Sequence, residues 1–218
     1  KDIIIIDNTN NNSTSKNRST NQSGNRSTRS TPSHSPVSDA KTPNSARGEG
    51  EARVDRLSSR ELVNACSRLR QETAELLKAG ADKVCINTAA CEDYDFIYKA
   101  CKTFGNQAIV GSVDYKNEQN ENIIYSNSGT KKTKLIFKDH LLELEKIGVG
   151  EVIITSIDKD GTMDGYDINT LKLATTTLKI PVIASGGAGS FEDMLNTIEK
   201  ANVSALAAAS IYHFTKHT

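Results

Sequence analysis

The chain has 218 residues with 27 basic and 27 acidic side chains, and 36% of its residues are apolar. Globular domains are about 45–50% apolar, so part of this chain is expected to lie outside any core. A net charge of zero, without a basic stripe or interleaved aromatic residues, gives no reason to expect a nucleic-acid partner. The opening run Ile3-Ile4-Ile5-Ile6 is too short for a signal peptide or a membrane span, so no membrane association is expected.

The apolar deficit is concentrated in residues 8–50. This segment is mostly Asn, Ser, Thr, Gly, Pro and Arg, and Val37 is its only residue larger than Ala that suits a core. Such a composition buries too little apolar surface to offset chain entropy, which predicts disorder. The sequence therefore predicts a possible strand in residues 1–7, a disordered low-complexity segment in 8–50, and a folded domain in 51–218.

Four cysteines occur without a C-x-x-C pair, and one of them falls inside an apolar, strand-like run: Cys66, Cys85, Cys91 and Cys101. This pattern favours reduced, buried thiols of a cytosolic protein over a metal site. Neither a metal ion nor a cofactor is expected.

Two elements are predicted before residue 80. The run Ile3 to Ile6, bounded by acidic residues, is typical of a buried strand of a parallel sheet. Ser58-x-x-Glu61 is a capping box, and apolar residues follow it at steps of three and four. This spacing predicts a helix over 59–78, ended by Gly80.

From residue 83 onward, short apolar runs alternate with helical segments. The predicted strands are 83–87, 108–114, 151–157, 181–185 and 205–209, and the predicted helices are 93–104, 138–147, 168–178 and 191–200. Residues 122–126 followed by Ser128-Gly129 predict a β-hairpin arm. Alternation of this kind predicts β/α units with a parallel sheet, which is the α/β fold class.

Ligands of such folds meet the carboxyl ends of the strands, where polar and glycine residues gather in this chain. Gly186 and Gly187 follow one predicted strand and open a helix, so their backbone amides can approach an anion. Paired with Ala209-Ser210 after the next strand, they predict a phosphate cup of the kind that follows the last two strands of a barrel. The alternative is a tight corner between strand and helix.

Three carboxylates also lie at predicted strand ends. Asp114 closes an otherwise apolar strand, where a carboxylate is solvated, paired or used in chemistry; alternatively it accepts hydrogen bonds from loop amides. Asp158 is expected to stabilise its Gly- and Thr-rich loop, and Asp160 suits either that structural role or the site.

Asn87 and Thr88 offer an amide and a hydroxyl at another strand end. They suit either a second anion or the cap of the following helix. His213 and His217 have no acidic or cysteine partner nearby in the sequence and are interpreted as incidental.

Three segments carry a resemblance to a known family. They are Ala79-Gly-Ala-Asp-Lys-Val-Cys-Ile-Asn-Thr-Ala-Ala90, Ile154-Thr-Ser-Ile-Asp-Lys-Asp-Gly-Thr-Met-Asp-Gly-Tyr-Asp167 and Pro181-Val-Ile-Ala-Ser-Gly-Gly-Ala-Gly189. In order and spacing they resemble the cyclase subunit of imidazole glycerol phosphate synthase, of histidine biosynthesis. The resemblance implies a (β/α)8 barrel and a cytosolic lyase. Its substrate would be a formimino-carboxamide ribonucleotide with a phosphate at each end, and a glutaminase partner would deliver ammonia through the barrel.

The resemblance also implies roles for individual residues. Asn87 and Thr88 would hold one phosphate, while Gly186, Gly187, Ala209 and Ser210 would hold the other. Asp114 would be one of two catalytic carboxylates, acting as general acid or base in a cyclisation that releases imidazole glycerol phosphate and an aminoimidazole carboxamide ribotide. Thr155, Ser156 and Asp160 would line the site. Gripping both remote ends of a substrate positions the reacting middle.

The sequence departs from the family pattern in three places. The family's first strand, which bears the other catalytic aspartate, would precede Ile3; its glycine-rich third strand is replaced by residues 8–50 and the predicted helix; and its last helix is absent. We therefore expect an incomplete barrel with unpaired edges and weak or absent cyclase activity.

Two other functions remain open. The segment Ser210-Ile-Tyr-His-Phe-Thr215 is similar to a paralogous branch that uses the same barrel and ammonia to amidate surface sugars. The chain also suits a non-catalytic remnant that still binds a phosphorylated metabolite or the glutaminase.

Overall fold

The computed structural model describes residues 3–6 and 59–213, with side chains from Ser67 onward. The predicted disordered segment 8–50 lies outside the described residues. The strands are β1 (Ile3–Ile6), β2 (Lys83–Ile86), β3 (Ile109–Glu118), β4 (Glu121–Ser126), β5 (Lys131–Ile136), β6 (Glu151–Ser156), β7 (Val182–Ser185) and β8 (Ala205–Leu206). The helices are α1 (Ser59–Lys78), α2 (Thr88–Glu92), α3 (Tyr94–Phe104), α4 (Phe137–Ile147), α5 (Ile168–Thr177), α6 (Phe191–Ala201) and α7 (Ser210–His213), with a 3-10 turn η1 at Asn106–Ala108.

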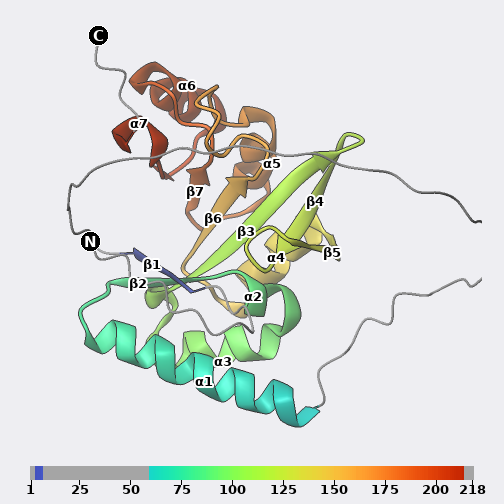
Figure 1. The fold of residues 1–218 in the computed structure, drawn as a ribbon, viewed down its shortest axis with the longest axis vertical. Coiled ribbons are helices and arrows are strands. Elements are labelled where there is room, and N and C mark those ends of the chain that lie inside the picture. Colours follow the sequence, from blue (N-terminus) through green and yellow to red (C-terminus); the bar gives the residue numbers. More distant parts are fainter. Residues whose placement is uncertain (1–2, 7–58, 214–218) are drawn as a thin grey trace, which may run out of the picture. The chain divides into compact units, whose positions relative to one another are not determined.

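The strands form one sheet in the order β1-β2-β3-β6-β7-β8, and all neighbours along this path are parallel. β4 pairs antiparallel with β3 and with β5, which makes the predicted hairpin arm (Figure 1). Within the part of the chain that the structure describes, β1 and β8 each pair along one edge only. The sheet therefore does not close, as predicted for an incomplete (β/α)8 barrel.

The N-terminal strand joins this sheet. β1 pairs with β2 along its whole length, from Ile3 opposite Lys83 to Ile6 opposite Ile86. It thus takes the position beside β2 that the absent third strand was expected to hold. The predicted strand in residues 1–7 is therefore found over Ile3–Ile6.

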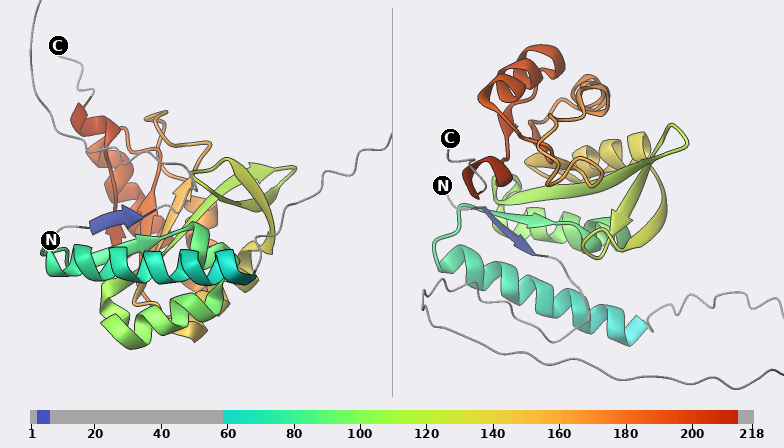
Figure 2. Two further views of the ribbon diagram at one scale, coloured as in Figure 1. Left: turned by 60° about the horizontal axis from the view of Figure 1, so that its bottom comes forward. Right: turned by 45° about the horizontal axis from the view of Figure 1, so that its top comes forward.

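The two faces of the sheet carry separate apolar clusters, because successive side chains of a strand point to opposite faces. One face packs against α1 and α3 to α6 through residues such as Val84, Val113 and Ile154. The opposite face carries a smaller cluster without helix residues, made of Cys85, Val110, Ile153 and Ile183. We call these the helix face and the inner face. Figure 2 shows α1 alongside α3 on the helix side of β2.

Short polar side chains cap the start of three helices. Asp93, Asp167 and Ser190 accept hydrogen bonds from the backbone N–H three residues later and cap α3, α5 and α6 at 3.0, 3.2 and 3.0 Å. α1 has the predicted bounds and is followed by Gly80 at φ +105°. These caps satisfy backbone donors that a helix leaves unpaired.

Several elements differ from the prediction, which did not include the turn η1 or the short helix α7. β3 runs on to Glu118 because β4 pairs with it from Asp114 onward. The short helix α2 was not foreseen. The last strand covers Ala205–Leu206 rather than 205–209, and the Tyr166 hydroxyl donates to the Ala207 carbonyl at 3.0 Å, where the predicted strand would have continued.

The predicted buried thiols are found at two of the three cysteines whose side chains the structure describes, while Cys91 is partly exposed. Cys85, Cys91 and Cys101 are free, and Cys85 and Cys101 are buried. Burial raises the pKa of the Cys85 thiol to about 12 and that of Cys101 to about 11, so both stay protonated at neutral pH. The side chain of Cys66 lies outside the described set. None of the described helices combines the length and the apolar character needed to cross a bilayer.

Candidate functional site

Three polar side chains form a row across the carboxyl ends of adjacent parallel strands. Asp114 on β3 is paired with Thr155 on β6, which is paired with Ser185 on β7. Strand alternation places them on the inner face, because Val110, Ile153 and Ile183 lie an even number of residues before them. All three are partly exposed. We call Asp114, Thr155 and Ser185 the carboxyl-end row.

Asp114 is held from both sides by the sheet. Its backbone pairs with Tyr125 of β4 and with Thr155 of β6. The Ser112 hydroxyl donates to Asp114 Oδ1 at 3.3 Å. A partly exposed carboxylate on a rigid strand has the position and the solvent access that a general acid or base needs.

Asn87 does not cap the helix that follows it. It occupies the N-cap position of α2, but its side chain makes no capping hydrogen bond. Instead Asn87 Nδ2 donates to the carbonyls of Ser112 and Tyr125 at 3.2 and 3.4 Å. The capping alternative is therefore wrong for this side chain, which spans the junction where β4 takes over from β2 as the neighbour of β3.

The hydrogen-bond donors of Asn87 and Thr88 are engaged within the protein. The Thr88 hydroxyl donates to Asn127 Oδ1 at 3.2 Å and accepts from the Asn127 N–H at 3.0 Å. Asn87 is 2% exposed, and its Oδ1 has no hydrogen-bond partner among the described residues. An amide oxygen only accepts hydrogen bonds, so it suits a hydroxyl or N–H of a ligand rather than phosphate oxygens. Any phosphate bound here would have to meet backbone amides.

The loops after β6, β7 and β8 pack together. Gly165 N–H donates to the Gly187 carbonyl at 2.8 Å, which joins the loop after β6 to the loop after β7. A Cβ on Gly186 would lie 2.6 Å from the Ser156 carbonyl oxygen, so that close approach requires glycine. The hydrogen bond from Tyr166 to the Ala207 carbonyl adds the segment that leads to Ala209 and Ser210. The loop after β6 thus contacts the loop after β7 at Gly187 and the segment after β8 at Ala207.

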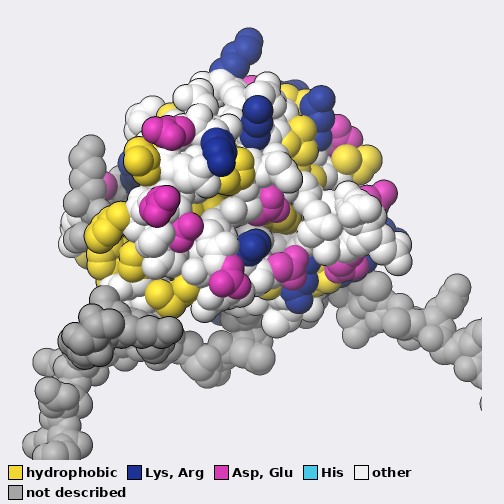
Figure 3. Space-filling view, turned by 90° about the horizontal axis from the view of Figure 1, so that it is seen from above, with side chains coloured by type: hydrophobic (Ala, Val, Ile, Leu, Met, Phe, Trp, Pro, Cys, Tyr) yellow, Lys and Arg dark blue, Asp and Glu magenta, His cyan; other side chains and the backbone are white. Residues whose placement is uncertain are grey.

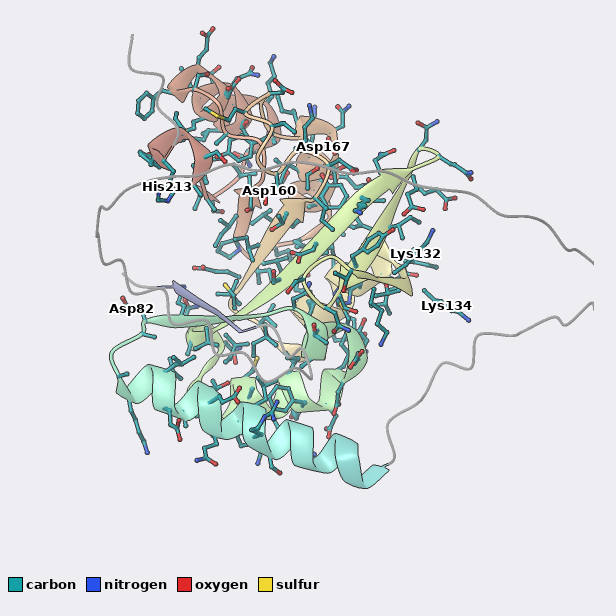
Figure 4. All side chains as sticks on the ribbon, in the orientation of Figure 1. Asp82, Lys132, Lys134, Asp160, Asp167 and His213 are labelled. Atoms are coloured by element: carbon teal, nitrogen blue, oxygen red, sulfur yellow. The ribbon has the colours of Figure 1, made fainter. Side chains whose placement is uncertain are left out.

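Two aspartates on the loop after β6 occupy different environments. Asp158 Oδ2 accepts a hydrogen bond from the Asn117 N–H at 2.8 Å, so it ties this loop to β3, as expected of a structural residue. The Asp160 side chain is exposed. Figure 4 shows it near the carboxyl end of β6, while Asp82 lies at the amino end of β2.

The structure does not bring Ser156 to the carboxyl-end row. Ser156 is 3% exposed and follows Thr155, so strand alternation turns it to the helix face. Because neighbouring residues of a strand cannot share a face, the prediction that both Thr155 and Ser156 line the site is corrected to Thr155.

Sequence reasoning left out two hydroxyls of the inner face, Ser112 and Ser185. Both stood in segments that were recognised as strand ends. Counting back by two from Asp114 would have found Ser112, and the strand pairing with Thr155 selects Ser185. His213 is exposed, and His217 lies outside the described residues.

Charges of both signs are mixed around the site. Figure 3 looks onto the side toward which β3 and β6 run, and shows Lys and Arg side chains interspersed with Asp and Glu. Without a broad basic surface in this view, anion binding would depend on local amides and hydroxyls.

Away from the site, a buried histidine on α4 was also missed. His140 is 1% exposed, and its Nδ1 lies 2.7 Å from the Tyr94 hydroxyl. Burial lowers the pKa of His140 from 6.5 to about 4, because the charged imidazolium loses its hydration.

Because of the lowered pKa of His140, we predict that the free energy of unfolding falls in acid. The folded pKa lies below the unfolded value, so the stabilisation is fully present above pH 6.5 and is lost as pH falls toward about 4. We expect about 3 kcal/mol of unfolding free energy to disappear over that window. Urea unfolding at a series of pH values should show a flatter profile for His140→Phe, whereas the exposed His213→Gln should keep the wild-type slope. Identical slopes for His140→Phe and wild type would contradict the prediction.

Comparison with known proteins decides which family this is. Residues 67–218 match the model of the family described as "Histidine biosynthesis protein". The chain belongs to this family. Its members form (β/α)8 barrels, in agreement with the parallel sheet and the two apolar faces found here.

Three similar curated proteins carry the name imidazole glycerol phosphate synthase subunit HisF. The protein from Dehalococcoides mccartyi is 40% identical over 169 residues, covering 76% of this chain and 67% of the relative. That from Dictyoglomus thermophilum is 45% identical over 149 residues, 68% of this chain and 59% of the relative. That from Chlorobium luteolum is 39% identical over 156 residues, 72% and 61% respectively. The chain thus spans between 59% and 67% of the length of these relatives.

Proposed function

We propose that this chain is a cyclase domain of imidazole glycerol phosphate synthase. It would add ammonia to a formimino-carboxamide ribonucleotide and release imidazole glycerol phosphate and an aminoimidazole carboxamide ribotide. The observation that supports this most is the carboxyl-end row, with Asp114 at the mouth of a parallel sheet in a family whose similar members carry that enzyme's name.

In this proposal Asp114 is the general acid or base. Thr155 lies next to it on the neighbouring strand, and the exposed Asp160 belongs to the loop above. A positioned proton donor or acceptor contributes about 100- to 10,000-fold to a rate. The rigid sheet would hold Asp114 against the reacting middle of the substrate.

The two phosphates would bind on either side of Asp114. One would meet the backbone of Gly186 and Gly187 and the segment Ala209-Ser210, where three loops pack together. The other would meet backbone amides at Asn87 and Thr88, because the donors of those side chains are engaged within the protein. Binding both ends lowers the entropic cost of bringing the reacting centre into register.

The ammonia would come from a glutaminase partner in a heterodimer. The relatives are named as subunits, which supports a partner. The inner face below the carboxyl-end row carries Cys85, Val110, Ile153 and Ile183, and this apolar lining suits passage of a small neutral molecule better than of an ion. We also propose that the protein works in the cytosol, where its free thiols stay reduced.

Growth of a histidine auxotroph that lacks the cyclase tests this function. The chain would be expressed alone and fused to the part of the Dehalococcoides mccartyi relative that the alignment does not cover. We expect the fusion to restore growth without histidine, and the chain alone to restore less. If the fusion fails while the intact relative succeeds, the chain is a non-catalytic remnant or serves the amidation of sugars. The names of the similar proteins favour the histidine pathway over amidation.

A further inference from the structure

We infer that Ser112 is a positioning residue for Asp114, whose carboxylate its hydroxyl holds in one orientation at the carboxyl-end row. The inference rests on the proposed function for the claim that Asp114 is catalytic. The contact itself is a hydrogen bond of 3.3 Å from Ser112 Oγ to Asp114 Oδ1. It follows from the strand, because residues two apart lie on the same face.

The position of Ser112 is itself fixed from both neighbouring strands. Its backbone pairs with Ile153 of β6. On the other side the pairing with β2 ends at Gly111. Beyond that point Asn87 Nδ2 donates to the Ser112 carbonyl at 3.2 Å. With 5% of Ser112 exposed, its hydroxyl has little water to compete for its proton. Asn87, predicted as a phosphate ligand, therefore also supports the residue that orients the carboxylate.

The backbone of Asp114 is equally constrained, since it is paired with β4 and β6 at once. The orientation of the side chain depends on its own contacts, and the hydrogen bond from Ser112 is one of them. A hydroxyl that donates to a carboxylate favours the ionised form of that carboxylate. Although 3.3 Å is long for an O–H···O bond, both residues sit on rigid backbone, so the hydroxyl stays within reach.

The test is the titration of the Asp114 carboxyl carbon by NMR in the full chain, without substrate. In Ser112→Ala we expect the titration midpoint to move to higher pH, because the ionised form loses the donor at Ser112 Oγ. Ser112→Thr keeps a hydroxyl at the same point and should return the midpoint toward wild type. Ser204→Ala, which removes an exposed hydroxyl before β8, should leave the midpoint unchanged.

Two results would overturn the inference. One is a Ser112→Ala midpoint equal to that of wild type; the other is an equal shift in Ser112→Ala and Ser112→Thr, which would assign the effect to packing. Should Ser112→Ala not fold, Ser112→Cys gives the same comparison, because a thiol has a similar shape but is a weak donor. Since the titration needs no turnover, failure of the histidine complementation would leave this contact standing, and the two proposals fail separately.

Discussion

Asp114→Asn is expected to abolish growth complementation and to lower ammonia-dependent turnover by about 100- to 10,000-fold, measured in the fusion that supports growth. Asparagine keeps the shape of the side chain and its ability to accept from Ser112 Oγ, but it cannot take up or release a proton in the relevant pH range. The fold should persist, because the Asp114 backbone pairs with both β4 and β6. The loss should therefore appear in kcat rather than in stability.

The matched control is Asp82→Asn, which removes one carboxylate at the amino end of β2, away from the carboxyl-end row (Figure 4). It should retain wild-type turnover and the wild-type free energy of unfolding. Steady-state rates at a series of ammonium concentrations separate the two variants. If Asp114→Asn turns over at the rate of Asp82→Asn, then Asp114 is not the catalytic carboxylate, whatever its position in the row.

The sequence carried enough information to predict the parallel sheet and most of its helices. Regular spacing made α1 predictable to its bounds, and Asp93, Asp167 and Ser190 are short polar residues that mark helix starts wherever they precede an apolar face. Side-chain periodicity and caps act within a few residues, so one sequence displays them directly.

Features that depend on pairing between distant segments were less predictable. β3 continues to Glu118 because β4 pairs with it. The Asn87 side chain does not cap a helix and instead donates to the carbonyls of Ser112 and Tyr125, which belong to other strands. Ser156 was placed in the site with Thr155 on the strength of the family resemblance, yet strand alternation turns its side chain to the helix face. Such choices are set by register, which only the folded sheet fixes.

The packing of the loop after β7 was also hidden, although its glycines were recognised. They were predicted to let an anion approach the backbone. In the structure the same glycines let two loops touch, with the Gly187 carbonyl accepting from Gly165 N–H at 2.8 Å. Anion binding by the backbone and close contact between two loops both require the absence of a side chain. The presence of glycine in the sequence therefore does not tell which of the two applies.

Gly187→Ala separates backbone strain from steric overlap when it is compared with Gly80→Ala. The two glycines have nearly the same positive φ, +106° at Gly187 and +105° at Gly80. A Cβ on Gly80 meets nothing within 4 Å, whereas a Cβ on Gly187 would lie 2.3 Å from the Gly165 carbonyl oxygen. Both variants bear the cost of a left-handed alanine, about 1–2 kcal/mol, and both restrict the unfolded chain equally.

The difference between the variants therefore reports mainly the steric overlap at Gly187. We expect Gly187→Ala to lose about 4 kcal/mol of unfolding free energy in urea denaturation, and Gly80→Ala about 1–2 kcal/mol. The obstacle at Gly187 is backbone, so relief requires the loop after β6 to move, and with it Asp160 and Tyr166. Equal losses in the two variants would mean that the loops after β6 and β7 are not in contact in solution. In that case the proposed phosphate site at Gly186 and Gly187 would lack the support of the loop after β6.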